Sequence, residues 1–219
     1  METTPYILKE FSPFTLETTV FEIKSFFKET SFNHFPVVSK NKLIGLISET
    51  DVENIDTDDK EIGYFQYVLK LFFSEENYNL LELLTVFASN ESNIIPIINS
   101  EKKYIGYYDL FDILNLINQT PFLKNEGTVL HLEKEINTFS FSEVCQIVES
   151  NKGKIFGFFV TNRTPSTIDF TLKFDSQLVN EILQSFRRYN YVVISKHKED
   201  FYLEDLKERS EYLQKYLNI

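Results

Sequence analysis

Two stretches of the chain share one pattern of apolar and polar positions. Each has an apolar run with a proline, a polar turn, a second apolar run with a glycine, and then an acidic segment; they read HFPVVSKNKLIGLISETD and IIPIINSEKKYIGYYDLFD. Apolar runs joined by a short polar turn predict β-hairpins. Pro36 and Pro96 lie sixty residues apart, whereas Gly45 and Gly106 lie sixty-one apart, so the extra residue falls in the turn. The pattern therefore predicts an internal repeat.

The first copy of the repeat is expected to begin with a short strand and a helix. Pro13–Leu16 has the composition of an extended segment, and Thr19 with Glu22 forms a capping-box pattern at the start of an amphipathic helix that ends near Glu29. The hairpin and a short helix follow. This copy is assigned to residues 1–60.

The second copy, assigned to residues 61–120, repeats the same order. We expect its extended piece within Tyr67–Phe73, its first helix over about Asn79–Ser89, and its last helix from Asp109 to about Asn118. A unit this small cannot bury its own apolar face, so the two copies are predicted to pack on one another and neither is expected to fold alone.

The rest of the chain predicts a second domain. After a linker at Gln119–Asn125, residues 126–199 show the order strand, helix, strand, strand, helix, strand, which indicates an antiparallel sheet with two helices on one face. The predicted elements are Thr128–Ile136, Phe141–Ser150, Lys154–Asn162, Thr167–Phe174, Ser176–Tyr189 and Tyr191–Lys196. The tail, residues 200–219, has Leu203, Leu206, Leu213 and Leu217 in the spacing of an amphipathic helix, which we expect to dock on its own dimer.

Composition excludes several classes of function. A net charge of −11 argues against a nucleic-acid surface. No apolar run reaches the ~18 residues of a membrane span, and the N-terminal residues lack a signal-peptide pattern, so a cytoplasmic, membrane-free protein is expected. Cys145 is the single cysteine and allows no internal disulfide.

Candidate catalytic and metal-binding residues are sparse. His34, His131 and His197 lie far apart, and Glu49–Glu61 is rich in carboxylates but lacks the spacing of an EF-hand loop. No phosphate-binding glycine loop or nucleophile motif is present. We therefore expect no metal, no required cofactor and no enzyme activity.

The repeated stretch resembles paired cystathionine β-synthase (CBS) domains. The fingerprint is an apolar-Pro-apolar-apolar strand, a turn, and Gly-apolar-apolar-Ser/Thr-x-x-Asp; the first copy matches it at Phe35, Pro36, Val37, Val38, Gly45, Ser48 and Asp51. The likeness covers about Pro13–Asn118. It implies an α/β (α+β) fold in which two β-α-β-β-α repeats form a pair, and adenosine-containing ligands often bind between such copies.

The resemblance implies a nucleotide site at His34, Phe35, Pro36, Ser48 and Asp51. In this interpretation the backbone at the start of the hairpin meets the adenine, the aspartate accepts from the ribose hydroxyls, and the serine lies near the phosphates. The residues also allow an alternative. Serine and aspartate three apart at a helix start are a common N-cap arrangement without any ligand.

A second, weaker site is implied at Ile95, Pro96, Asp109 and Asp112. Here Asp109 replaces the serine or threonine of the fingerprint and places a negative charge where a phosphate would lie. We expect this cleft to reject phosphates, to hold a neutral nucleoside, or to stay empty.

The C-terminal element order resembles an ACT domain, a ferredoxin-like βαββαβ regulatory module, and the whole layout resembles acetoin-utilisation-type CBS proteins. The glycine usual after the first ACT strand is missing from Asn137–Ser140, which favours a dimerisation or partner-docking role over amino-acid binding. We predict a non-enzymatic, homodimeric regulatory protein that senses an adenine nucleotide (AMP, ADP or ATP) and relays it through dimer contacts or to a regulated protein partner. The alternative is a ligand-free dimerisation scaffold.

Overall fold

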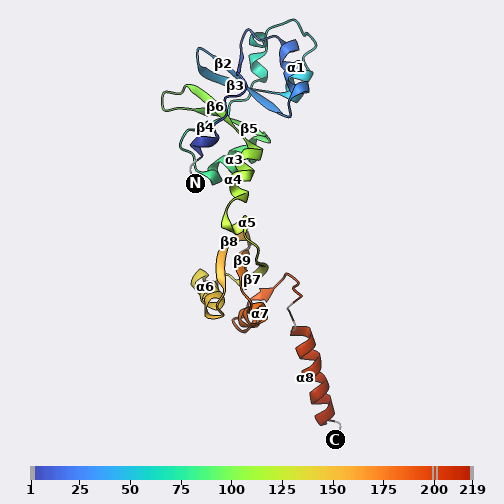
Figure 1. The fold of residues 1–219 in the computed structure, drawn as a ribbon. Helices are drawn as coiled ribbons and strands as arrows, with labels where there is room; N and C mark the ends of the chain where they lie inside the picture. The colour runs from blue at the N-terminus through green and yellow to red at the C-terminus, as the bar shows by residue number, and fades with distance from the viewer. Residues whose placement is uncertain (1–2, 199, 201, 218–219) are drawn as a thin grey trace. The chain divides into compact units, whose positions relative to one another are not determined.

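The computed structural model describes residues 3–198, 200 and 202–217. The chain divides into two compact units, Met1–Ile117 and Asn118–Ile219 (Figure 1), which are treated separately below. Within the described residues no helix is long and apolar enough to cross a membrane.

The first unit contains the predicted repeat. After a 3-10 turn at Thr4–Tyr6, the first copy comprises β1 (Phe14–Thr15), α1 (Val20–Glu29), β2 (His34–Ser39), β3 (Lys42–Ser48) and α2 (Glu49–Glu53). The second comprises β4 (Ser74–Glu75), α3 (Leu80–Asn90), β5 (Ile94–Ile98), β6 (Tyr104–Asp109) and α4 (Leu110–Asn118). In each copy a short strand pairs in parallel with the first hairpin strand, giving the sheets β1-β2-β3 and β4-β5-β6. The β-α-β-β-α order is confirmed in both copies.

The first helix of each copy begins at a capping box. The Thr19 hydroxyl accepts from the Glu22 N–H at 3.3 Å, and the Glu22 carboxylate accepts from the Thr19 N–H at 2.8 Å. Asn79 and Glu82 make the same pair of bonds at the start of α3. Each cap satisfies N–H groups that the first helical turn leaves without partners.

One local prediction is wrong. Tyr67–Phe73 is not the strand of the second copy: a 3-10 segment spans Ile62–Val68, and β4 begins at Ser74. This stretch is held by the first copy, because Ile62 is fully buried in its core. The predicted linker contains a short helix, α5 (Pro121–Lys124), which proline at its first position favours.

An approximate two-fold relation links the copies through Asn33 and Asn93. Each backbone N–H donates to the other residue's side-chain oxygen at 3.0 Å. The two amide groups donate to the carbonyl oxygens of Glu91 and Ser31 at 2.8 and 2.7 Å, again as a symmetric pair. The four bonds fix the starts of β2 and β5 against each other.

Aromatic rings fill the core of the first copy. Phe35 is fully buried, with its ring centroid 4.4 Å from that of Phe26 and 5.2 Å from that of Phe14. Ile94 and Tyr107 of the second copy belong to the same cluster. The apolar face of one copy is therefore covered partly by the other, which explains why the repeat occurs as a pair.

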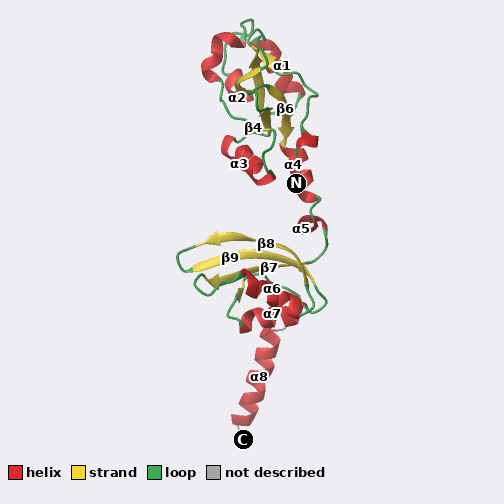
Figure 2. Cartoon of the chain, turned by 90° about the vertical axis from the view of Figure 1, so that its left-hand side faces the viewer, coloured by secondary structure: helices red, strands yellow, loops and turns green. Residues whose placement is uncertain are grey.

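The second unit has the predicted ferredoxin-like order. Its elements are α5, β7 (Thr128–Glu135), α6 (Phe141–Ser150), β8 (Lys154–Arg163), β9 (Thr167–Asp175), α7 (Val179–Arg188), β10 (Val192–Val193) and α8 (Tyr202–Leu217). The strands form an antiparallel sheet in the order β10-β7-β9-β8. Figure 2 shows α6 and α7 on one face of this sheet, where residues such as Val148, Leu172 and Phe186 form a single core.

The tail is helical, as predicted. In α8 the described side chains of Leu206, Leu213 and Leu217 are exposed, whereas that of Leu203 lies outside the described residues. Docking of this helix on a dimer stays a prediction.

Candidate functional site

Each hairpin is bordered by the segment that leads into the other copy. Lys70, just before β4, exchanges two backbone hydrogen bonds of 2.8 and 3.0 Å with Leu46 of β3. Leu8, before β1, exchanges equivalent bonds with Tyr107 of β6. Each of the two predicted clefts is therefore bordered by residues of one hairpin and of a distant leading segment.

The fingerprint glycines make this crossing possible. At Gly106, whose φ is +148°, an added Cβ would lie 2.5 Å from the Leu8 carbonyl oxygen. At Gly45 an added Cβ would lie 3.0 Å from the Leu69 Cβ and 3.2 Å from the Lys70 carbonyl oxygen. Backbone approach of this kind requires a residue without a side chain.

Ser48 and Asp51 form the N-cap of α2 in the first cleft. The Ser48 hydroxyl accepts from the Asp51 N–H at 2.9 Å and donates to its carboxylate Oδ2 at 2.6 Å. Ser48 is buried, but the Asp51 side chain keeps 32% of its surface exposed. The capping geometry predicted from the sequence is confirmed, and one side of the carboxylate remains accessible.

Lys70 is a component of the first cleft that sequence reasoning missed. Its Nζ lies 3.8 Å from Asp51 Oδ2, and its side chain is 64% exposed. An ion pair this exposed contributes little to stability. Its relevance is that an ammonium group, free to reorient, stands beside the accessible carboxylate.

His34 lies at the start of β2, opposite Ser48 across the hairpin, with its ring edge against Phe72 at 5.6 Å. Its Nδ1 is 3.0 Å from Asn33 Oδ1. An amide oxygen only accepts, so Nδ1 carries the proton and Nε2 carries a lone pair. Burial lowers the pKa of the imidazole, the Lys70 ammonium lowers it further, and the Asp51 carboxylate opposes both. At neutral pH this side chain is therefore uncharged, and within the described residues its Nε2 has no hydrogen-bond partner.

Phe35 and Pro36, the other predicted residues of this cleft, are buried in β2. The Phe35 ring belongs to the aromatic core and is not available to a ligand.

The second cleft differs in charge. Asp109 caps α4 by accepting from the N–H groups of Phe111 at 2.7 Å and Asp112 at 3.3 Å. Ile95 and Pro96 are buried in β5. Where the first cleft has Lys70, the second has Leu8.

Buried Tyr107, on β6, lies within electrostatic range of three carboxylates. Burial raises the pKa of its hydroxyl to about 12, with smaller contributions from the carboxylates of Glu10, Asp109 and Asp112. A phosphate bound near these carboxylates would be repelled by them, and rejection of phosphates by the second cleft stays a prediction.

The remaining candidates are structural. His131 Nδ1 is 2.9 Å from the Thr171 hydroxyl, and His197 Nε2 is 2.6 Å from the Ser195 hydroxyl. Cys145 is a half-buried free thiol on α6. Across the described ranges no group of three or more His, Cys, Asp or Glu side chains could hold a metal.

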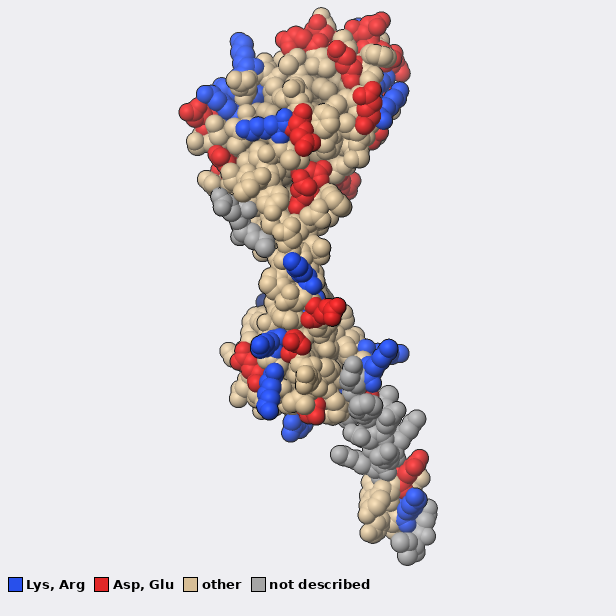
Figure 3. All heavy atoms as spheres, viewed as in Figure 1, with Lys and Arg blue, Asp and Glu red and all other residues tan. Residues whose placement is uncertain are grey.

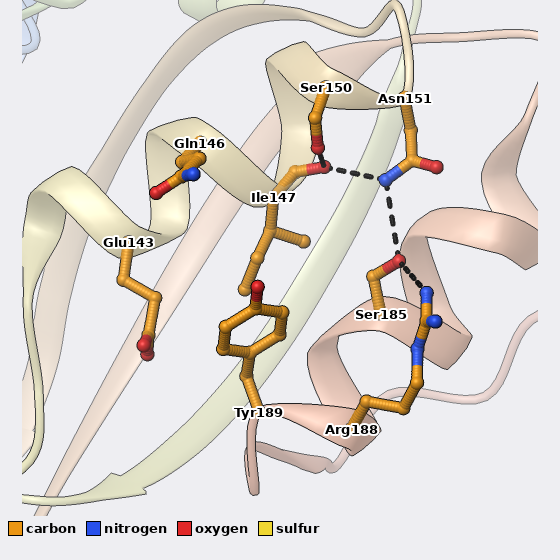
Figure 4. Close-up of a pocket in the computed structure, with 8 residues that line it drawn as sticks. All are labelled: Glu143, Gln146, Ile147, Ser150, Asn151, Ser185, Arg188 and Tyr189. Carbon is orange, nitrogen blue, oxygen red and sulfur yellow. Dashed lines mark hydrogen bonds between the residues drawn. The ribbon is translucent and has the colours of Figure 1, made fainter.

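A cavity of about 410 Å³ lies between α6 and α7 (Figure 4). Its polar groups bond to one another: Ser185 accepts from Asn151 at 3.3 Å and from Arg188 at 2.9 Å. Glu143, also in the lining, lies 3.7 Å from the ammonium of buried Lys134. The cavity is thus lined by side chains that already hold the two helices and the sheet together.

We predict that Ser48→Ala lowers the free energy of unfolding by about 1 kcal/mol, because the N-terminal N–H groups of α2 lose their acceptor. Urea unfolding followed by circular dichroism measures this. Thr50→Ala, an exposed change on the same helix, should stay within about 0.5 kcal/mol of the wild type. Equal losses in both variants would contradict the cap.

The comparisons place the first copy in a known family. A model of the CBS domain matches residues 7–55. The uncharacterized protein MJ0188 of Methanocaldococcus jannaschii is 24% identical over 140 residues, covering 59% of this chain and 53% of that protein. The uncharacterized protein MJ1232 of the same organism is 29% identical over 116 residues, covering 51% and 38%. The chain thus spans about half or less of the curated relatives it matches.

Solved structures with similar folds include CBS-domain proteins. A CBS domain pair/ACT domain protein (TM0892) from Thermotoga maritima is 20% identical, covers 53% of this chain and 96% of that chain, and has a TM-score of 0.48. The cytosolic domain of the Mg2+ channel MgtE in complex with ATP is 17% identical, covers 51% and 46%, and has a TM-score of 0.43. The family model identifies a CBS domain at residues 7–55, and the structure adds a second copy of the same architecture and a ferredoxin-like unit.

Proposed function

We propose that the first cleft binds an adenine nucleotide and that the chain is a non-enzymatic regulatory protein. The observation that carries the proposal is the meeting of Asp51, Lys70 and neutral His34 at one end of the first hairpin. Lys70 is distant in sequence from Asp51 and His34 and reaches the cleft from the segment that leads into the second copy. The three side chains therefore do not meet merely because they are neighbours in the sequence or in the core.

The three side chains offer complementary chemistry. The exposed side of the Asp51 carboxylate can accept from both ribose hydroxyls. The Lys70 ammonium can turn from Asp51 toward a phosphate, for which lysine serves as a point charge. His34 Nε2 is buried and has a lone pair, so it can accept from an N–H donor such as the exocyclic amine of adenine when the ligand displaces the side chains that cover it.

Calorimetric titration of AMP, ADP and ATP into the full chain tests the proposal. We expect one nucleotide to bind per chain, at the first cleft, because the second has acidic residues and no lysine at the matching position. A complete absence of heat and of thermal stabilisation with all three nucleotides would refute nucleotide binding.

A ligand-free scaffold is the second candidate. It is favoured by the Ser48 hydroxyl, which already donates to Asp51 and accepts from the Asp51 N–H, and is therefore committed to the helix cap. In that case Asp51 and Ser48 would stabilise the pair of copies and nothing more.

We predict that Lys70→Leu, which copies the second cleft's Leu8, weakens ATP binding by about tenfold or more, because a hydrogen bond to a charged group contributes about 1.5–3 kcal/mol. Binding of adenosine, which has no phosphate, should change by less than about twofold. Titrations of both ligands measure the difference. Lys9→Leu removes the same charge from an exposed position of the other leading segment and serves as the control. An equal loss of ATP affinity in Lys9→Leu would show that the effect comes from the net charge of the chain and not from the position of Lys70.

A further inference from the structure

His34 is a buried polar residue, and one of its ring nitrogens has no partner. Figure 3 shows Lys, Arg, Asp and Glu side chains of the first unit at its surface, where water solvates them. His34, in contrast, is only 7% exposed, and among the described residues its Nε2 forms no hydrogen bond. A buried acceptor without a partner destabilises a folded chain, so packing alone does not explain this residue.

The second copy shows that the fold does not require a polar residue at this position. Ile94 lies sixty residues after His34, begins β5 as His34 begins β2, and is fully buried. An apolar side chain therefore fills the same place in the repeat without an unpaired nitrogen. Of the two copies, the one with the histidine is also the one with Lys70 beside Asp51.

Asn33 determines which ring nitrogen of His34 carries the proton. Its Nδ2 donates to the carbonyl oxygen of Glu91 at 2.8 Å, and its Oδ1 accepts from the backbone N–H of Asn93 at 3.0 Å. A carbonyl oxygen only accepts and a backbone N–H only donates, so the orientation of this amide is fixed. The same Oδ1 lies 3.0 Å from His34 Nδ1, which is therefore the protonated nitrogen.

The remaining ring nitrogen, Nε2, is an acceptor. Burial and the Lys70 ammonium lower the pKa of His34, against the opposing effect of Asp51, so the ring carries one proton at neutral pH. The hydrogen bond made by one ring nitrogen determines which of the two holds that proton. Without Asn33, Nε2 could hold the proton and would then be a donor.

We propose that Asn33 is a positioning residue for ligand recognition in the first cleft. By holding the imidazole proton on Nδ1, it keeps Nε2 of His34 an acceptor, so that the cleft selects purine nucleotides that carry an amine at C6. The amine supplies the donor that Nε2 lacks, once the ligand displaces the side chains that cover this nitrogen. Because Glu91 and Asn93 hold Asn33, residues of the second copy contribute to the base preference of the first cleft. Asn33 can act in this way only if the first cleft binds a nucleotide, so the inference rests on the proposed function.

Two triphosphates that differ only in the amine test the role of His34. Purine riboside triphosphate is ATP without the amine at C6. In calorimetric titrations we expect the wild-type chain to bind ATP about tenfold more tightly, because only ATP gives Nε2 a partner. His34→Ile introduces the residue of the second copy and should bind the two ligands with affinities within about twofold of each other.

The titrations separate this inference from nucleotide binding itself. Equal binding of both triphosphates by the wild type, or a tenfold preference that persists in His34→Ile, overturns the inference and leaves nucleotide binding intact. Failure of both triphosphates to bind refutes nucleotide binding, and the inference with it.

Asn33→Ala and Asn93→Ala distinguish positioning from a structural role. Each variant loses one bond from the other asparagine's N–H and one bond to a carbonyl oxygen, so the two should lose similar stability. Only Asn33→Ala also removes the partner of His34 Nδ1. We expect Asn33→Ala to reduce the preference for ATP to less than about threefold, and Asn93→Ala to keep the wild-type preference.

Nitrogen NMR of the His34 ring in the ligand-free chain adds a readout that a merely structural role would not change. Wild type and Asn93→Ala should have the proton on Nδ1, whereas Asn33→Ala should have it at least partly on Nε2. If both alanine variants unfold, the wild-type spectrum and the His34→Ile titrations still decide the matter. A wild-type proton on Nε2, an unchanged preference in Asn33→Ala, or an equal loss of preference in Asn93→Ala overturns the proposal.

Discussion

Replacing Asp51 with alanine is expected to remove the stabilisation that an adenine nucleotide gives to the folded chain. A ligand at about a hundred times its dissociation constant raises the free energy of unfolding by about 2.7 kcal/mol when it binds the folded state alone. The Asp51 carboxylate is the proposed acceptor for both ribose hydroxyls, so its loss would leave two buried donors unpaired. The nucleotide-dependent increment should fall close to zero.

The measurement is thermal unfolding of wild type and variant with and without ATP. Asp51 also accepts from the Ser48 hydroxyl, so the variant loses some stability in the absence of ligand. The increment, and not the absolute midpoint, is therefore compared. Asp112→Ala makes the matching change in the second cleft and should keep the full increment; equal losses from both would refute the difference between the clefts.

The elements of this chain were predictable where their periodicity is local. The hairpins, the capping box of Thr19 and Glu22, and the order of the C-terminal sheet follow from apolar spacing and cap residues. The strand β4 was not predictable from the sequence. Its two residues, Ser74 and Glu75, have no apolar pattern and form a strand only by pairing with Ile97 and Ile98. Tertiary pairing, which leaves no local signal, defines this strand.

The residues of the first cleft were predictable only where they are close together in the sequence. Ser48 and Asp51 were recognisable because cap and fingerprint coincide within four residues. Lys70 was not, because it enters the cleft from another part of the chain. A sequence signal did exist for the Asn33–Asn93 pair: each asparagine precedes the proline-containing apolar run of its copy, sixty residues from the other.

The two copies differ in the charge of their predicted clefts and of their outer faces. The first copy has the lysine and the serine of its cleft and a charged outer face at α1 and α2. The second has an acidic cleft and an apolar outer face at α3 and α4. The Asn33–Asn93 bonds and the shared aromatic core connect the two copies.

This connection predicts that the first copy cannot fold without the second. A fragment of residues 1–73 keeps every element of the first copy, including buried Ile62 and the Lys70 pairing with Leu46. It lacks Ile94 and Tyr107, which belong to the aromatic core, and the β6 partner of Leu8. Removing large core side chains costs about 3–5 kcal/mol each, against a total stability of about 5–15 kcal/mol for a domain.

We therefore expect fragment 1–73 to show no cooperative thermal transition. A fragment of residues 1–118, which contains both copies, should melt cooperatively and serves as the control. Differential scanning calorimetry and near-ultraviolet circular dichroism of the aromatic core distinguish the two. A sharp transition in fragment 1–73 would show that the rings of the first copy pack adequately alone, and that the second copy is attached to a domain which does not need it.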